Sequence, residues 1–439
     1  MLMKKKIRVL CSMAVMSLVS GVALAQDLTI AIVGNGASSQ MRELASDFTK
    51  KNPEIQLHWI ALKEDILRRW VVADIATNRG QYDIITINAY ELPIWAKEGW
   101  LISLDDLHVS YDVDDILPAI RDGSSVDGSL YAAPFYVEGA MVMYRKDLMK
   151  KAGLTMPKAP SWNFIRKAAK ILTDKDEEIY GICVRGKAGW LDNVAFLTSM
   201  AHSFGAKWFD LEWNPQFDSD AWKETLNFYL DMMEESGPAE ASSSGFSENF
   251  SLFQNGKCGI WIDDTYAASS VTNSVYSEVH GQVGFALLPH QDPGNRADWF
   301  WTWNLAIPVS SKKVATAKKF ISWATSKDYP ALLASKWKWT NAPPGTRASF
   351  YENPKYAKVP FAQVMLDGIN SADSKNPAVE PVPYIGVHFV AIPEYQSIAM
   401  GVGQQFSDAL AGRISADVAL KNAQDLTIRI MRKAGYIKQ

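Results

Sequence analysis

Strands and amphipathic helices alternate over residues 27–88, and this alternation is the feature that most constrains the fold. After the strand-like segment DLTIAIV, hydrophobic residues recur with the i, i+3, i+4, i+7 spacing of an amphipathic helix, and the same succession then repeats. Strands are expected at residues 27–33, 55–60 and 82–88, and helices around residues 41–48 and 67–75. Strand and helix alternating in this way predict an α/β fold built on a mainly parallel sheet.

In such sheets ligands bind beyond the carboxyl ends of the strands. This rule selects three loops, at residues 34–39, 62–65 and 88–92. The candidate ligand groups in them are Asn35, Glu64, Tyr90 and Glu91. Two of these have an alternative role that stays open: Asn35 lies between glycines and could be a simple turn residue, and Glu91 could be a solvated loop carboxylate.

The segment WFWTWNLAIP, residues 299–308, carries three tryptophans at alternate positions. A strand places Trp299, Trp301 and Trp303 on one face, and Leu305 and Ile307 continue that face as core. The indole row is either ordinary packing or the wall of a carbohydrate pocket, since such pockets combine aromatic walls with a few polar groups. We assign Trp301 and Trp303 to the ligand wall and Trp299 to packing.

A chain of 439 residues exceeds one small core, so two domains or more are expected. The long extended run YAAPFYVEGAMVMY, residues 131–144, is interrupted by Pro134 and Gly139 and predicts a strand that passes between two lobes. Tyr136 and Glu138 flank Val137 and therefore share one face of this strand, and both are candidate ligand groups. Residues 299–308 are a second candidate crossing strand.

Further polar candidates lie in the second half of the fold. The strand CGIWIDDT ends in Asp263 and Asp264; one carboxylate accepts ligand hydroxyls while the other caps the next helix, and Asp263 is favoured for the ligand. Arg185 follows the strand of Cys183 and is either a forked donor to the ligand or part of a surface salt bridge. Trp190 is assigned to the cleft wall.

The first 25 residues have a basic start, a short apolar stretch and a small-x-small end, which predict a secretory signal peptide cut between Ala25 and Gln26. A membrane anchor is the alternative, but the apolar stretch is short for a span. The mature protein is expected in the bacterial periplasm. In that oxidising compartment Cys183 and Cys258 either form a disulfide or remain two buried thiols.

The formal net charge of −3 argues against a general nucleic-acid binder, which would show a basic stripe. Two cysteines of the mature chain and six histidines lack metal-ligand spacing, so neither a metal nor another cofactor is expected.

Several segments, taken in order, resemble the extracellular solute-binding proteins of ABC importers, in the maltose-binding-like family 1. They include DFTKKNPEIQLHWI, RGQYDIITINAYELPIWAKEGWLISLDDL, DGSLYAAPFYVEGAMVMYRKDLMKKAGL, LFQNGKCGIWIDDT and LAGRISADVALKNAQ. ICVRGKAGW, NAPPGTR and VPYIGVHFVAIPEYQ are similar to the sorbitol/mannitol branch of that family. Val137-Glu138-Gly139 departs from the smaller polar residues expected there, which leaves the preferred polyol open.

The resemblance implies a two-lobed periplasmic binding protein fold, with a mainly parallel sheet flanked by helices in each lobe and a ligand cleft at the hinge. The N-terminal lobe is expected to span residues 26–136 and 304–350, and the C-terminal lobe residues 137–303 and 351–439. The resemblance also places Arg347, in NAPPGTR, at the cleft. It implies a monomer that captures a sugar alcohol by lobe closure, delivers it to ABC permease subunits in the inner membrane, and performs no chemistry.

Two other function classes compete with this interpretation. One is a binding protein for a mono-, di- or oligosaccharide. The other is a periplasmic glycoside-processing enzyme, which would also carry tryptophans and paired carboxylates. The adjacent Asp263 and Asp264 point apart along a strand, and the chain contains neither G-x-S-x-G nor H-E-x-x-H, so we expect no catalysis.

Overall fold

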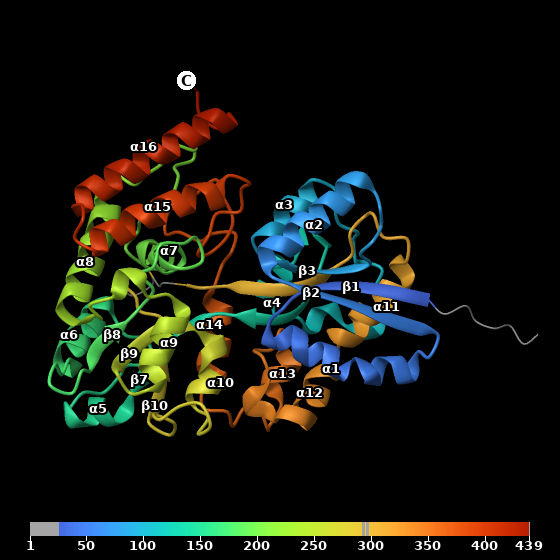
Figure 1. Ribbon diagram of the computed structural model, residues 1–439, viewed down its shortest axis with the longest axis horizontal. Coiled ribbons are helices and arrows are strands. Elements are labelled where there is room, and N and C mark those ends of the chain that lie inside the picture. The colour runs from blue at the N-terminus through green and yellow to red at the C-terminus, as the bar shows by residue number, and fades with distance from the viewer. Residues whose placement is uncertain (1–25, 292–294, 296–297, 439) are drawn as a thin grey trace, which may run out of the picture.

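The computed structural model describes residues 26–291, 295 and 298–438, and the predicted signal peptide with its cleavage site at Ala25 lies outside them. Two lobes lie side by side, each a β-sheet with helices packed against it (Figure 1). The α/β, two-lobed architecture expected from the sequence is therefore confirmed. None of the described helices is long and apolar enough to cross a membrane.

The first lobe is built on a five-stranded sheet with the order β2-β1-β3-β11-β6. Its strands are β1 (Gln26–Val33), β2 (Ile55–Leu62), β3 (Ile84–Asn88), β6 (Ala133–Glu138) and β11 (Trp301–Ala306). β1 runs parallel to β2 and β3, whereas β11 runs antiparallel to both β3 and β6. Since β11 is antiparallel to both of its neighbours, β6 runs in the same direction as β1, β2 and β3. The sheet is therefore mainly parallel, as expected, and only β11, which enters it from far along the chain, runs against the other strands.

The helices of the first lobe are α1 (Gly36–Lys51), α2 (Glu64–Thr77), α3 (Glu91–Lys97), α4 (Pro118–Gly123), α11 (Val314–Ala324), α12 (Tyr329–Trp337) and α13 (Ala348–Glu352). Two of them, α1 and α2, contain the hydrophobic stripes predicted from the sequence. The Asn35 side chain caps α1 by accepting from the Ser38 N–H at 2.9 Å, and Lys50 and Lys51 lie in the last turn, where cations favour the helix dipole. A short hairpin, β4 (Ser125–Val126) and β5 (Ser129–Leu130), turns at Asp127-Gly128.

The second lobe is built on a four-stranded sheet with the order β10-β7-β9-β8. Its strands are β7 (Ala140–Arg145), β8 (Tyr180–Cys183), β9 (Cys258–Asp264) and β10 (Val283–Ala286). β8 and β9 are parallel, and β7 is antiparallel to both β9 and β10. A disulfide joins Cys183 to Cys258 with a Cα–Cα distance of 6.2 Å, so of the two alternatives left open by the sequence the structure has the bonded pair.

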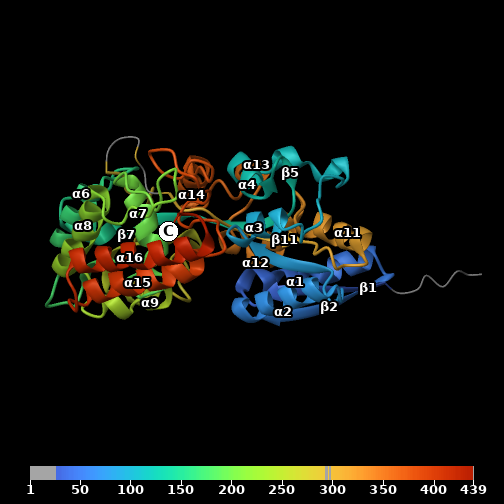
Figure 2. The ribbon, with the colours of Figure 1, turned by 90° about the horizontal axis from the view of Figure 1, so that it is seen from above.

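Helices cover this second sheet on both sides. They are α5 (Lys146–Lys151), α6 (Trp162–Leu172), α7 (Asn193–Ser203), α8 (Asp220–Ser236), α9 (Phe246–Gln254), α10 (Ala268–Val271), α14 (Ala362–Ser371), α15 (Tyr395–Leu410) and α16 (Ala416–Ala434). α15 and α16 lie against each other along the outside of the lobe (Figure 2). Much of the tryptophan content is core, since Trp162, Trp208, Trp222 and Trp261 are fully buried.

The lobes are joined where strands pass from one sheet to the other. The extended run at residues 131–144 divides at Gly139 into β6 of the first sheet and β7 of the second. β6 extends to Glu138 and β11 begins at Trp301, so the first sheet includes residues on both sides of the expected divisions after residues 136 and 303. The assignment of chain segments to lobes stays a prediction, while the crossing itself sets the position of the cavity described next.

Candidate ligand-binding site

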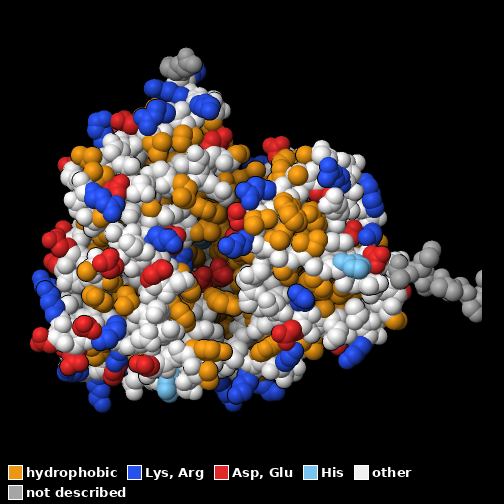
Figure 3. All heavy atoms as spheres, viewed as in Figure 1, with side chains coloured by type: hydrophobic (Ala, Val, Ile, Leu, Met, Phe, Trp, Pro, Cys, Tyr) orange, Lys and Arg blue, Asp and Glu red, His pale blue; other side chains and the backbone are white. Residues whose placement is uncertain are grey.

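A cavity of about 270 Å³ lies between the lobes. It is lined by Val33, Asn35, Gly36, Tyr136, Glu138, Arg185, Leu191, Asp264, Tyr266, Trp299, Trp301 and Trp303. Figure 3 shows a hollow between the two lobes with acidic side chains at its floor. The size is near the lower end of the range for small-molecule pockets, and the mixture of aromatic walls with a few polar groups is typical of them.

The cavity is built from strand ends, as the rule for α/β sheets predicts. Val33 ends β1, and Asn35 and Gly36 follow it. Arg185 comes two residues after β8, and Asp264 is the last residue of β9. The carboxyl ends of strands from both sheets therefore meet at one place, and the crossing strands β6 and β11 close its base.

The register of β6 against β11 gives the cavity its aromatic wall. Trp301 is paired with Glu138 and Trp303 with Tyr136, so these four side chains stand on one face of the sheet. The Tyr136 and Trp303 rings lie nearly parallel, with centroids 6.4 Å apart. Trp299 also lines the cavity, which differs from its assignment to packing alone, and its indole stacks on His388 at 4.3 Å.

A chain of hydrogen bonds connects the two lobes across the cavity. The Asn35 Nδ2 group donates to the Tyr136 hydroxyl at 2.9 Å, and the Tyr136 hydroxyl is hydrogen-bonded to the Glu138 carboxyl group. Glu138 is in turn hydrogen-bonded to Asp264. Asn35 therefore caps α1 and lines the cavity at once.

Glu138 and Asp264 form a buried carboxyl pair. Burial raises the pKa of Glu138 well above its ordinary value, and the neighbouring Asp264 charge raises it further. Burial also raises the pKa of Asp264, to about 6. A hydrogen bond that the backbone N–H of Tyr266 donates to Asp264 Oδ1 at 2.7 Å opposes this rise, because it stabilises the ionised form. Since two adjacent buried carboxylates repel each other, the charge on Asp264 disfavours ionisation of Glu138.

Asp263, which the sequence favoured over Asp264 as the ligand group, does not line the cavity. Its carboxylate receives Arg185 Nη2 at 2.6 Å and Nε at 3.0 Å, together with the Trp261 indole N–H at 3.2 Å. These donors occupy both oxygens of Asp263. Asp264 caps the following 3-10 helix, which is the role the sequence left to it, and it also lines the cavity, whereas Asp263 does neither.

Arg185 lies in the cavity wall but is held there by protein groups. Besides Asp263 it donates to the Leu191 carbonyl, and its guanidinium lies 5.2 Å from the Trp299 ring centre. The ion pair between Arg185 and Asp263 is buried, so it is not a surface salt bridge. Since the guanidinium is bound to Asp263, Arg185 is also not an unpaired donor that faces the ligand. Its position shapes the wall and fixes the end of β9.

Glu64 and Glu91 lie away from the cavity, in a charged cluster of the first lobe. Glu91 is buried in an ion pair with Arg68, and Glu64 accepts the Asn88 side-chain amide at 2.7 Å. Burial raises the pKa of Glu91 to about 7 although the Arg68 charge opposes this. Glu91 is therefore not a solvated loop carboxylate, and this cluster joins the start of α2 to the start of α3.

Tyr90 and Trp190 form a contact between the lobes beside the cavity. The Tyr90 hydroxyl donates to the Ile392 carbonyl at 2.9 Å, and its ring lies 5.4 Å from that of Trp190. Trp190 also packs against Trp301, at 5.9 Å. Trp190 therefore supports the indole row and Tyr90 packs against Trp190, and neither residue lines the cavity itself.

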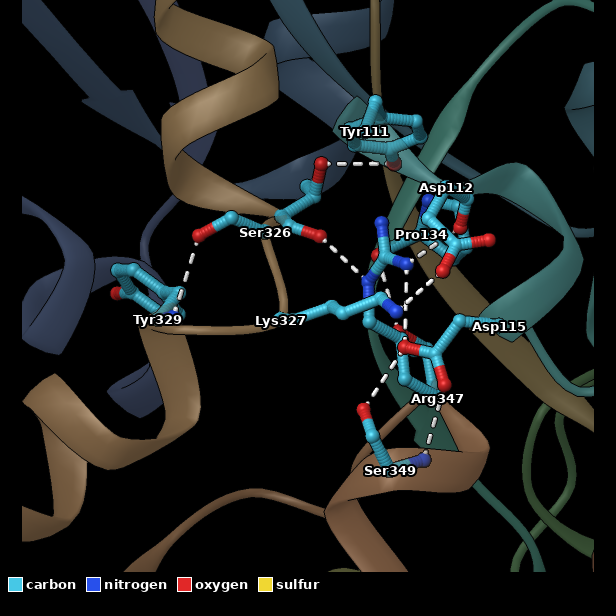
Figure 4. Close-up of polar contacts among 11 residues, drawn as sticks. Tyr111, Asp112, Asp115, Pro134, Ser326, Lys327, Tyr329, Arg347 and Ser349 are labelled. Atoms are coloured by element: carbon cyan, nitrogen blue, oxygen red, sulfur yellow. Dashed lines mark hydrogen bonds and ion pairs between the residues drawn. The ribbon is translucent and has the colours of Figure 1, made fainter. Parts of the chain in front are cut away.

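Arg347 lies in the body of the first lobe, not at the cavity expected from the resemblance. Its guanidinium donates to the carbonyls of Thr325 and Asp112, pairs with Asp115 at 3.3 Å and lies 4.6 Å from the Tyr111 ring centre (Figure 4). Only 2% of the residue is exposed. It ties the start of α13 to the segment that precedes α4.

Five cavity residues were not among the predicted ligand groups: Val33, Gly36, Leu191, Tyr266 and Trp299. The strand-end rule could have found Tyr266, because it follows the Asp264 strand by two residues. A Cβ at Gly36 would overlap the Tyr266 hydroxyl, so glycine allows α1 to approach the second lobe. Among the described residues no group of three His, Cys, Asp or Glu side chains could hold a metal ion.

The chain belongs to the family of bacterial extracellular solute-binding proteins, whose pattern it matches over residues 34–329. It is 45% identical to the mannitol-binding protein of Pseudomonas aeruginosa over 414 residues, which cover 94% of this chain and 95% of that protein. An erythritol/L-threitol-binding protein of Mycolicibacterium smegmatis is 25% identical over 274 residues, 58% of this chain and 57% of that protein.

Solved structures agree with this assignment. An ABC transporter solute-binding protein of Agrobacterium vitis with bound D-mannitol superposes with a TM-score of 0.87 at 60% identity, covering 94% of this chain and 100% of that one. A solute-binding protein of Agrobacterium radiobacter in complex with ribitol has a TM-score of 0.77 at 23% identity, covering 91% of this chain and 97% of that one. The second likeness concerns the fold alone.

Proposed function

We propose that this protein is the periplasmic solute-binding component of an ABC importer and that it captures a sugar alcohol of the mannitol, sorbitol or arabinitol type in the cavity between its lobes. The observation that carries the proposal is the 60% identity, over nearly the whole chain, to a structure with bound D-mannitol. The cavity supports it with chemistry suited to a ligand that consists almost entirely of hydroxyl groups.

Each polyol hydroxyl can donate one hydrogen bond and accept others, and each needs partners when buried. Asp264 and Glu138 supply acceptors. Donors come from the indoles of Trp299, Trp301 and Trp303, because no described residue accepts a hydrogen bond from their Nε1 groups. The indole rings also shape the cavity and exclude water from the polar contacts.

Ligand binding is proposed to favour the closed arrangement, because only closed lobes contact the ligand from both sides. The closed, monomeric protein then docks on permease subunits in the inner membrane. Export through cleavage between Ala25 and Gln26 places the chain in the periplasm. No bond of the ligand is changed, since the related proteins of this family bind solutes.

Calorimetric titration of residues 26–439 tests the proposal. The ligands are D-mannitol, D-sorbitol, D-arabinitol, xylitol, D-glucose and maltose. We expect one-to-one polyol binding with dissociation constants in the micromolar range, about −8 kcal/mol, and no binding of the sugars. Binding of glucose or maltose without polyols would favour a saccharide-binding protein, and appearance of a product would favour the enzyme.

A further inference from the structure

The charges around the cavity do not cancel. The cation in its wall, Arg185, is already matched by Asp263, with which it makes contacts of 2.6, 3.0 and 3.1 Å. Glu138 and Asp264 form no ion pair with any Lys, Arg or His of the part of the chain that the structure describes. The cavity therefore keeps the negative charge of the carboxyl pair without a protein counter-ion.

Repulsion within the pair limits this charge. The charge on Asp264, whose pKa is about 6, disfavours a second charge on Glu138, so the negative charge of the cavity is centred on Asp264. Asp264 is itself only 8% exposed, so water screens that charge poorly. Asp192 and Lys187 lie further out beside Arg185 and oppose each other in sign.

The walls around this charge are aromatic. Tyr136 and Tyr266 stand beside the carboxyl pair, and the indoles of Trp299, Trp301 and Trp303 complete the enclosure. Ring faces attract cations, and tryptophan does so most strongly. A single negative charge enclosed by aromatic rings is the arrangement that recognises an organic cation, in addition to the hydroxyl chemistry already described.

We infer that this cavity also takes amino sugar alcohols, in which one terminal hydroxyl of the polyol is replaced by a protonated amine placed beside Asp264. An ammonium group is close in size to the hydroxyl that it replaces, donates up to three hydrogen bonds instead of one, and supplies the missing positive charge. For the same reason the cavity rejects a polyol that ends in a carboxylate. This inference rests on the proposed function, since it assumes that the polyol chain lies in the same cavity.

The test compares three ligands that differ only at one end: D-mannitol, 1-amino-1-deoxy-D-mannitol and D-mannonate. Calorimetric titration of the wild-type protein at neutral pH is expected to give an amine affinity at least threefold above that of D-mannitol, and an acid affinity at least a hundredfold below it. The advantage of the amine should vanish when the pH is raised above the pKa of the ligand amine, because the neutral amine carries no charge.

Two variants identify the charge as the cause. Glu138→Gln copies the protonated form of Glu138 and leaves Asp264 charged, so the ratio of the D-mannitol and amine dissociation constants should stay within threefold of wild type. The double variant Glu138→Gln/Asp264→Asn removes the charge, and the same ratio should fall at least tenfold. The ratio is used because both residues line the cavity and either change alters binding of every ligand.

The outcomes separate the inference from the function on which it rests. If D-mannitol binds and the amine binds more weakly, the inference is overturned and the proposed function stands. A ratio that is unchanged in the double variant also overturns the inference. If none of the three ligands binds, both the inference and the proposed function are contradicted.

Discussion

At the scale of single residues, adjacent side chains of the same type carry different roles here because of their neighbours. Asp263 and Asp264 are consecutive on β9, so they point to opposite sides of the sheet. Asp263 meets Arg185, and Asp264 meets the cavity and Glu138. The sequence shows two carboxylates at a strand end, but it does not show which of them faces a buried cation 78 residues away.

This division predicts opposite phenotypes for two similar substitutions. Asp264→Asn should weaken D-mannitol binding at least tenfold with little change in stability, because the ligand loses a charged acceptor. Asp263→Asn should lower the free energy of unfolding by about 3 kcal/mol, since it leaves Arg185 buried without its counter-ion. Urea unfolding and calorimetric titration of both variants measure the two quantities, and the reverse pattern would contradict the assignment.

Glu138 makes stability depend on pH. Its pKa is raised in the folded protein, so the folded state holds a proton that the unfolded chain has lost, and the free energy of unfolding falls as the pH rises above about 4.5. Glu138→Gln removes this loss. The stability of the variant relative to wild type should increase as the pH rises above about 4.5, as followed by urea unfolding at several pH values. A difference that is constant with pH would show that Glu138 is ionised in the folded protein.

At the scale of secondary-structure elements, local patterns predict the helices and strands well and their pairing poorly. Hydrophobic spacing predicts α1 and α2, and Gly139 divides the extended run into β6 and β7 as a break in the pattern suggests. The antiparallel entry of β11 beside β3 cannot be read locally, because it joins segments more than 200 residues apart. That entry makes the sheet mixed and brings the tryptophan row to the cavity.

The disulfide belongs to this scale because it ties β8 to β9, 75 residues apart. Without the bond, the unfolded chain gains conformational entropy. Removing a native disulfide typically lowers the free energy of unfolding by about 2–5 kcal/mol for this reason. We expect Cys183→Ser/Cys258→Ser to lower the free energy of unfolding by about 3 kcal/mol. Dithiothreitol should destabilise the wild-type protein by a similar amount and leave the variant unchanged; equal stability of wild type and variant would count against the bond.

At the scale of the whole molecule, the lobes touch through a few specific contacts beside the cavity. Tyr90 reaches the Ile392 carbonyl, Lys375 pairs with Asp122 at 3.2 Å, and Gly36 lies against the Tyr266 hydroxyl. None of these pairs has a sequence signal, because each depends on how one lobe is placed against the other. The same reason explains why Tyr90 was expected at the ligand and lies elsewhere.

The contact at Gly36 can be tested with a double-mutant cycle. Gly36→Ala should weaken D-mannitol binding by about threefold to tenfold, because its methyl group forces the Tyr266 ring aside and hinders closure. Combining it with Tyr266→Phe, which removes the hydroxyl, should recover part of the loss. Additive effects in the cycle would show that the two residues do not meet when ligand is bound.

The central claim is that a polyol lies between the lobes against the carboxyl pair and the indole row. A crystal structure of the protein with D-mannitol tests it most directly. The account predicts mannitol in the cavity, with hydroxyl oxygens within hydrogen-bond distance of Asp264 and Glu138 and the carbon chain beside Trp301 and Trp303. Mannitol bound outside this cavity, or inside it with no contact to either carboxyl group, would contradict the account.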